Sequence, residues 1–137
     1  MIRHFIALET FTHQMDCFCP GNEKADFFHI HRADVMEITE ERKFVIGSGW
    51  YYLILINDER RFYVAYEDLQ QYVLDGQLLS MVDIELEMNY LVFQVNQSLD
   101  NNDEMSFGKY AKKLKESKTF KDKLENYITH TTVDSAS

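Results

Sequence analysis

Apolar residues recur every three or four positions from residue 81 to 99, which is the spacing of one helix face. The stripe consists of Met81, Ile84, Met88, Leu91, Val92, Val95 and Leu99. Residues 82–88 also alternate between apolar and polar, as a strand does, but the periodic run is too long for a strand and contains no Gly or Pro. Ser80 and Asp83 have the spacing of a short capping box. We therefore predict a helix that begins after Ser80.

A polar turn at residues 100–102 is predicted to lead into a second helix. Asp103 and Glu104 would lie in its first turn, where the helix dipole favours anions, and lysines crowd its far end. Its buried stripe would be Phe107, Tyr110, Ala111 and Leu114. Thr119, with Asp122 three positions later, predicts the cap of a last helix. The inner face of that helix would be Phe120, Leu124, Tyr127 and Ile128.

The first half of the chain is rich in β-branched and aromatic residues, which favour strands. We predict strands at residues 2–12, 25–38, 44–46, 50–56 and 61–65, and charged or polar turns at residues 40–43 and 57–60. Gly47-Ser48-Gly49 is interpreted as a β-bulge or a sharp strand bend. Residues 67–75 would form a short helix that ends at Gly76.

Strands followed by helices indicate the α+β class, with an N-terminal antiparallel sheet of about four to five strands followed by three to four C-terminal helices. The 137 residues are most simply one domain. Its β-rich part would be residues 1–66, its helical part 67–129 with a helical hairpin at 82–117, and its frayed tail 130–137. No leader and no apolar run of membrane-spanning length is visible, so a cytoplasmic location without a membrane partner is expected.

Acidic residues dominate the charge of the chain. The net charge of −9 argues against nucleic acid as a partner. Residues 62–108 contain nine acids and no Lys or Arg, whereas residues 109–123 contain seven lysines. One interpretation is that these charges are solvated helix faces that partly balance one another within the fold. Alternatively, they form an acidic surface that steers a basic partner towards it.

One group of residues has the chemistry of a zinc site: His13, Cys17, Cys19, His29 and His31. Cys-x-Cys and His-x-His each place two side chains on one face of an extended segment, and zinc accepts such ligands. The spacing matches no common zinc module, so the favoured interpretation is two histidines on a half-exposed strand and two reduced cysteines near a turn. No phosphate loop and no Gly-x-Ser-x-Gly motif is present. We therefore expect no cofactor, no metal and no catalytic residue.

The junction between the two long helices, residues 93–107 (FQVNQSLDNNDEMSF), resembles the IDEAL domain of Bacillus-type bacteria. Its motif positions are occupied by Val95, Asn96, Ser98, Leu99, Asp100, Asp103 and Phe107, and its trailing apolar positions by Tyr110 and Leu114. Asn96 and Ser98 stand where that family has Asp and Ala. The resemblance implies a small, cytosolic, non-enzymatic protein of a Gram-positive bacterium or its phage, in some cases an adaptor in regulated proteolysis.

The leading hypothesis is therefore a non-catalytic, regulatory, adaptor-like module that uses an acidic helical surface to bind another protein, with a basic protein as the partner that this charge favours. The residues predicted to bind the partner are Trp50, Tyr52, Asp100, Asp103 and Glu104. One alternative is an acidic inhibitor that mimics nucleic acid and occupies a DNA-binding protein. Another is a zinc- or thiol-dependent enzyme that uses the Cys/His group. A homodimer is also plausible, because Val82, Leu86 and Tyr90 are apolar but lie outside the main helical stripe.

Overall fold

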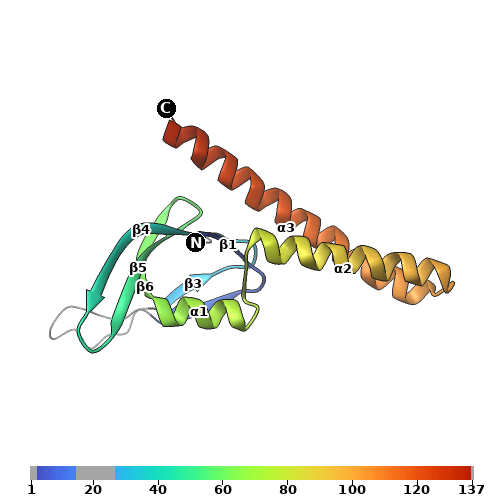
Figure 1. Ribbon diagram of the computed structural model, residues 1–137, viewed down its shortest axis with the longest axis horizontal. Helices are drawn as coiled ribbons and strands as arrows, with labels where there is room; N and C mark the ends of the chain where they lie inside the picture. The colour runs from blue at the N-terminus through green and yellow to red at the C-terminus, as the bar shows by residue number, and fades with distance from the viewer. Residues whose placement is uncertain (1–2, 15–26, 137) are drawn as a thin grey trace. The chain divides into compact units, whose positions relative to one another are not determined.

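The computed structural model describes residues 3–14 and 27–136, with side chains described up to residue 130. The chain divides into two compact units, Met1–Leu79 and Ser80–Ser137. The described part of the first unit contains all the strands and a short helix, and the second contains two long helices (Figure 1). The predicted α+β class, with an antiparallel sheet followed by helices, is confirmed. The prediction of a single domain stays a prediction.

The first unit is built on a five-stranded sheet in the order β6-β5-β4-β1-β7. Every neighbouring pair in it is antiparallel. Its strands are β1 (His4–Ala7), β4 (Val35–Val45), β5 (Gly49–Ile56), β6 (Arg60–Ala65) and β7 (Leu78–Leu79). A separate two-stranded ribbon consists of β2 (Phe11–Gln14) and β3 (Phe27–Ile30), and α1 spans Tyr66–Leu74.

The core of this unit lies on one face of the sheet. The register pairs Phe5 with Met36 and Ile38 with Ile54, so these side chains point to the same side. They form one cluster with Ala7, Ile30, Ile56, Phe62, Val64, Leu69 and Leu78. Since Leu69 belongs to α1 and Ile30 to β3, the helix and the ribbon both cover this face.

The prediction of one strand over residues 2–12 is wrong, because the chain leaves the sheet after Ala7 and forms β2 in the ribbon. The crossing point is held by Arg32, whose backbone N–H donates to Thr10 Oγ1 at 3.0 Å and whose Nε donates to the Leu8 carbonyl at 3.3 Å. Residues 8–10, Leu-Glu-Thr, contain none of the Gly, Pro, Asn or Asp residues that usually mark a turn. The pattern therefore cannot show that the chain changes sheets.

Two further boundaries differ from the prediction. The expected strand over residues 25–38 is interrupted by a turn at 31–34, where Ala33 adopts a φ of 74°. An alanine in this left-handed conformation is rare, so nothing in the sequence marked the turn. The expected turn at residues 40–43 is instead part of β4, with a register shift between Ile38 and Arg42. Gly47, at a φ of 87°, lies in the hairpin turn between β4 and β5 rather than in a bulge.

The β5–β6 hairpin and α1 follow the prediction. Asn57 and Asp58 adopt φ values of 53° and 60° in the turn, as expected for a tight hairpin. Gly76, with a φ of 76°, follows the end of α1. In β5 the run from residue 54 to 56 is buried on both faces of the strand, but Trp50 is exposed.

The second unit is a helical hairpin of α2 (Met81–Asp100) and α3 (Glu104–Ala136). The predicted capping box is confirmed: Ser80 Oγ accepts from the Asp83 N–H at 3.2 Å, and the Asp83 carboxylate accepts from the Ser80 N–H. The predicted break at Thr119 is wrong, because its hydroxyl donates to the Lys115 carbonyl one turn back within a continuous helix. This helix continues to Ala136 instead of ending as the predicted frayed tail. Among the described helices, none is both long and apolar enough to cross a membrane.

Candidate interaction surfaces

The turn of the helical hairpin is closed by backbone hydrogen bonds. The N–H of Asn102 donates to the Leu99 carbonyl at 3.2 Å, and that of Asp103 donates to the Ser98 carbonyl at 2.9 Å. Asn102 adopts a φ of 54°, a conformation that Asn tolerates better than most residues. The predicted turn between the two helices is therefore present, and its polar residues make it possible.

Asp103 is committed to capping α3. Its carboxylate accepts the backbone N–H of Ser106 at 3.1 Å and the Ser106 hydroxyl at 2.7 Å. These two donors hold the pKa of the Asp103 carboxyl below its usual value, so the side chain is ionised at neutral pH. Asp100 and Glu104, the other two acids predicted to bind the partner, are exposed beside this cap. The described hydrogen bonds do not involve their carboxylates.

A shallow pocket of about 210 Å³ lies at the turn. It is lined by Ser98, Leu99, Asn102, Asp103, Glu104 and Phe107. Leu99 is 56% exposed, and Met105, which follows Glu104, is 88% exposed. Leu99 and Phe107 were predicted to belong to the inner stripes of the two helices, and this is wrong because both are exposed. The α2 residues that face α3 follow a heptad spacing at positions 84, 88, 91, 95 and 98, so Leu99 lies one position outside this face. The turn thus combines apolar side chains with carboxylates.

Trp50 and Tyr52, the two predicted contact residues of the first unit, have different surroundings. Trp50 is exposed near the end of the β4–β5 hairpin, with the Phe44 ring 5.3 Å away and the Arg42 guanidinium 4.8 Å above its ring. Tyr52 is half-buried and packs against Tyr66 with ring centroids 5.7 Å apart. Trp50 is therefore available for contact, whereas Tyr52 mainly extends the core. The sequence did not point to Phe44 as the neighbour of Trp50, because the register that pairs them was not predictable.

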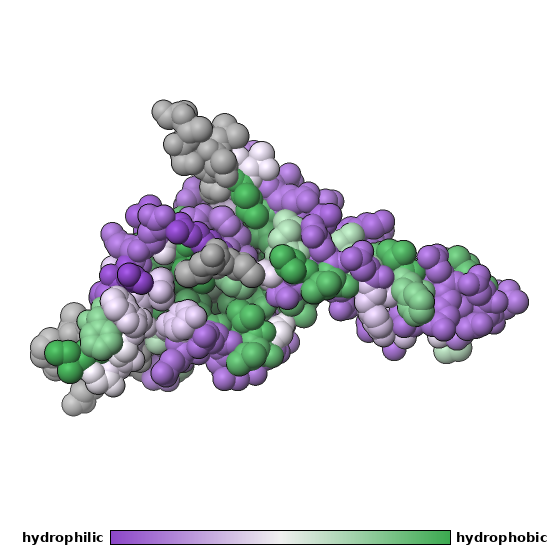
Figure 2. All heavy atoms as spheres, in the orientation of Figure 1, coloured by the Kyte–Doolittle hydropathy of each residue, from purple (hydrophilic) through white to green (hydrophobic). Residues whose placement is uncertain are grey.

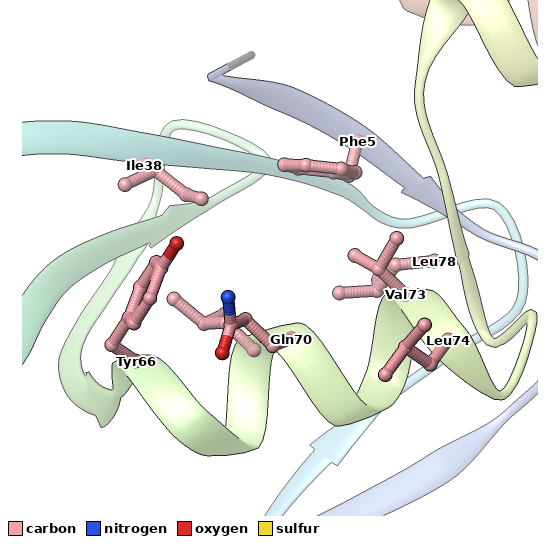
Figure 3. A pocket seen from close by; sticks show the side chains of 8 residues that line it. Phe5, Ile38, Tyr66, Gln70, Val73, Leu74 and Leu78 are labelled. Atoms are coloured by element: carbon pink, nitrogen blue, oxygen red, sulfur yellow. The ribbon is translucent and has the colours of Figure 1, made fainter. Parts of the chain in front are cut away.

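An apolar groove of about 380 Å³ lies between α1 and the sheet of the first unit. Figure 3 shows Phe5 and Ile38 on the sheet side and Tyr66, Gln70 and Leu74 on the α1 side. Among the residues that line the groove, only Gln70 and Tyr66 carry polar side-chain groups, an amide and a hydroxyl. Such a groove suits an apolar group, but the lining carries no charge that would select one.

The predicted Cys/His group is described only in part, since Cys17 and Cys19 lie outside the described residues. The ribbon register pairs His13 with Phe28 and Thr12 with His29. Neighbouring positions point to opposite faces, so His13 and His29 lie on opposite faces of the ribbon. His31 lies beyond β3, with Nδ1 3.7 Å from the Asp34 carboxylate. The described residues contain no cluster of three or more potential metal ligands.

His13 instead joins the ribbon to α1. It is almost completely buried, and its Nδ1 lies 2.6 Å from the Tyr72 hydroxyl. Burial, and secondarily the negative charge of Asp68, raises the pKa of Tyr72 to about 12. The phenol therefore keeps its proton at neutral pH and is not a base there. The contact between His13 and Tyr72 therefore links the ribbon to α1 and is not an arrangement for proton abstraction. A polar hollow of about 300 Å³ adjoins it.

Comparison of the chain with protein-family models, with curated proteins and with solved structures finds no match.

Proposed function

We propose that this protein is a non-catalytic interaction module whose helical hairpin turn binds a basic, partly apolar segment of another protein. The observation that carries the proposal is the surface of the turn, where exposed Leu99 and Met105 stand beside the carboxylates of Asp100 and Glu104. Exposed apolar side chains next to exposed carboxylates supply both burial energy and electrostatic steering for a partner of opposite charge. The resemblance of residues 93–107 to the IDEAL domain supports the same proposal.

The two alternatives have less support. An acidic mimic of nucleic acid needs rows of carboxylates, but α3 of the same hairpin carries seven lysines between residues 109 and 123. A zinc-dependent enzyme needs its ligands to converge, whereas His13 and His29 lie on opposite faces of the ribbon. The turn therefore remains the preferred site.

The test is a quantitative capture experiment with purified protein immobilised as bait and a Bacillus lysate as the source of partners. Met105→Ser removes the most exposed apolar side chain at the turn, and the double change Asp100→Asn with Glu104→Gln removes its uncommitted charges. Asp122→Asn removes an exposed carboxylate from α3, outside the turn, and serves as the matched control. Asp103 is left unchanged because it caps α3.

The expected result is a protein retained by the wild type and by Asp122→Asn but lost from both turn variants, with less retained as the salt concentration rises. Loss of retention by the charge variant alone would indicate steering without apolar contact. If no protein distinguishes the wild type from the two turn variants, the proposed site is wrong.

A further inference from the structure

The helix α2 carries a second apolar stripe, which faces away from α3. The stripe consists of Val82, Leu86, Tyr90 and Phe93, and each of these residues is between 52% and 63% exposed. With 3.6 residues per turn, the spacings of four, four and three place these side chains on one face. The buried residues Ile84 and Leu91 point to the opposite side of the same helix. Apolar surface is visible over the helical hairpin in Figure 2.

A helix that is apolar on two opposite faces is typical of one packed on both sides, because a helix at the surface of a bundle has a single apolar face. One face of α2 is covered by α3. Four exposed apolar side chains that share one helix face are typical of a surface that another protein element covers.

The sizes of the four side chains fit a second copy of the same stripe in antiparallel orientation. The N-terminal half carries the aliphatic Val82 and Leu86, and the C-terminal half carries the aromatic Tyr90 and Phe93. In an antiparallel pair, Phe93 would meet Val82 of the second copy and Tyr90 would meet Leu86, so each large ring faces a smaller side chain. A parallel pair would instead place the largest side chains against each other.

The charges along α2 select the same orientation. Three acids flank the stripe in the N-terminal half, namely Asp83, Glu85 and Glu87; Asp83 also closes the capping box, and Glu85 lies 3.8 Å from Lys121 of α3. The C-terminal half carries the uncharged amides of Asn89, Gln94, Asn96 and Gln97, and its first acid is the final residue, Asp100. An antiparallel pair sets the carboxylates of one copy beside the amides of the other. A parallel pair would set carboxylates beside carboxylates, and like charges at an interface are unfavourable.

We infer that this protein forms a homodimer through α2, with the two helices packed antiparallel about a two-fold axis that passes between Leu86 and Tyr90. The stripe is then an isologous interface, in which the same residues serve both copies. The two helical hairpins together form four packed helices, with the two α2 helices at the centre. The inference is independent of the proposed function, because the turn residues lie outside the stripe.

The first experiment measures the molar mass of the protein in solution by light scattering and by sedimentation over a range of concentrations. The wild type should have twice the chain mass of 16.3 kDa. Leu86→Lys should raise the dissociation constant by about 30-fold or more, since a charge then replaces a central apolar contact. Met105→Lys is the matched control, because it makes the same change of charge at an exposed apolar site outside the stripe.

Leu86→Lys should leave the fold intact, since the side chain is mostly exposed in a single copy, and the far-UV circular dichroism spectrum checks this. A wild type that stays at the mass of one chain up to about millimolar concentration overturns the inference, because an interface that weak lies at the limit of specific association. A dimer that Leu86→Lys does not weaken also overturns it, since the contact then lies elsewhere.

Disulfide cross-linking tests the orientation in protein whose Cys17 and Cys19 are replaced by Ser. The variants Val82→Cys and Phe93→Cys should form a cross-link when mixed, while neither cross-links efficiently alone. Efficient cross-linking of either variant with itself would indicate parallel helices and would refute the antiparallel arrangement. Capture of a partner through the turn distinguishes the two proposals: Met105→Ser should abolish capture and preserve the dimer, and Leu86→Lys should do the reverse.

Discussion

The carboxylate of Asp34 accepts three hydrogen bonds that join two segments of the first unit, and its removal should be costly. It accepts the His31 backbone N–H at 2.8 Å, Asn57 Nδ2 at 3.0 Å and Arg60 Nη2 at 3.3 Å. Asn57 in turn accepts the Val35 N–H through Oδ1 at 2.9 Å. The carboxylate therefore fixes the turn before β4 to the turn between β5 and β6, two segments that are far apart in the chain.

We predict that Asp34→Ala lowers the free energy of unfolding of the first unit by about 3 kcal/mol. Each of the bonds from His31 and Asn57 contributes about 1 kcal/mol, and the charged contact to the partly exposed Arg60 adds about 0.5–1 kcal/mol. Leaving these partly buried donors without an acceptor adds to this loss. Glu59→Ala removes an exposed carboxylate in the neighbouring turn, so it should change stability by less than about 0.5 kcal/mol and serves as the control.

Urea unfolding followed by the fluorescence of Trp50 is the appropriate assay, because this is the only tryptophan of the chain and it belongs to the same unit. The expected result is a lower urea midpoint for Asp34→Ala with an unchanged slope. Equal midpoints for Asp34→Ala and Glu59→Ala would refute the reasoning, since the network would then contribute nothing beyond an ordinary surface charge.

Three further predictions concern burial, capping and pH. Leu91→Ala, at a side chain only 1% exposed, should destabilise the helical hairpin by about 2–5 kcal/mol, whereas Val92→Ala next to it should cost less than about 1 kcal/mol. Thermal unfolding compares the two variants, followed by the circular dichroism of the helices at about 222 nm. Ser80→Ala removes one half of the capping box and should cost about 1 kcal/mol in the same assay, while no change would show that the cap is dispensable. The raised pKa of Tyr72 favours the folded state below the ordinary tyrosine pKa of 10.0, and this contribution should be lost as the pH rises from 10.0 to about 12. Ultraviolet titration should show a late-ionising tyrosine that disappears in Tyr72→Phe, and its persistence would contradict the assignment.

The candidate sites were only partly visible in the sequence. The acids at residues 100, 103 and 104 could be identified because a polar turn between two periodic segments is a local feature. The exposed positions of Leu99 and Met105 could not, since the identity of the inner face depends on how α2 and α3 pack. Trp50 is exposed, and its role as a contact residue stays a prediction; its neighbour Phe44 is defined by strand register.

The sequence by itself determined the features that arise from neighbouring residues: the capping box at Ser80, the turn after Asp100, the β5–β6 hairpin and the α+β class. These depend on helical periodicity, turn chemistry and side-chain caps, which act over a few residues. Only the tertiary structure decided where β1 ends and β2 enters another sheet, that α3 is continuous through Thr119, and that Leu99 lies outside the face of α2 that packs on α3. Such choices depend on contacts between segments distant in the chain, and local pattern carries no information about those contacts.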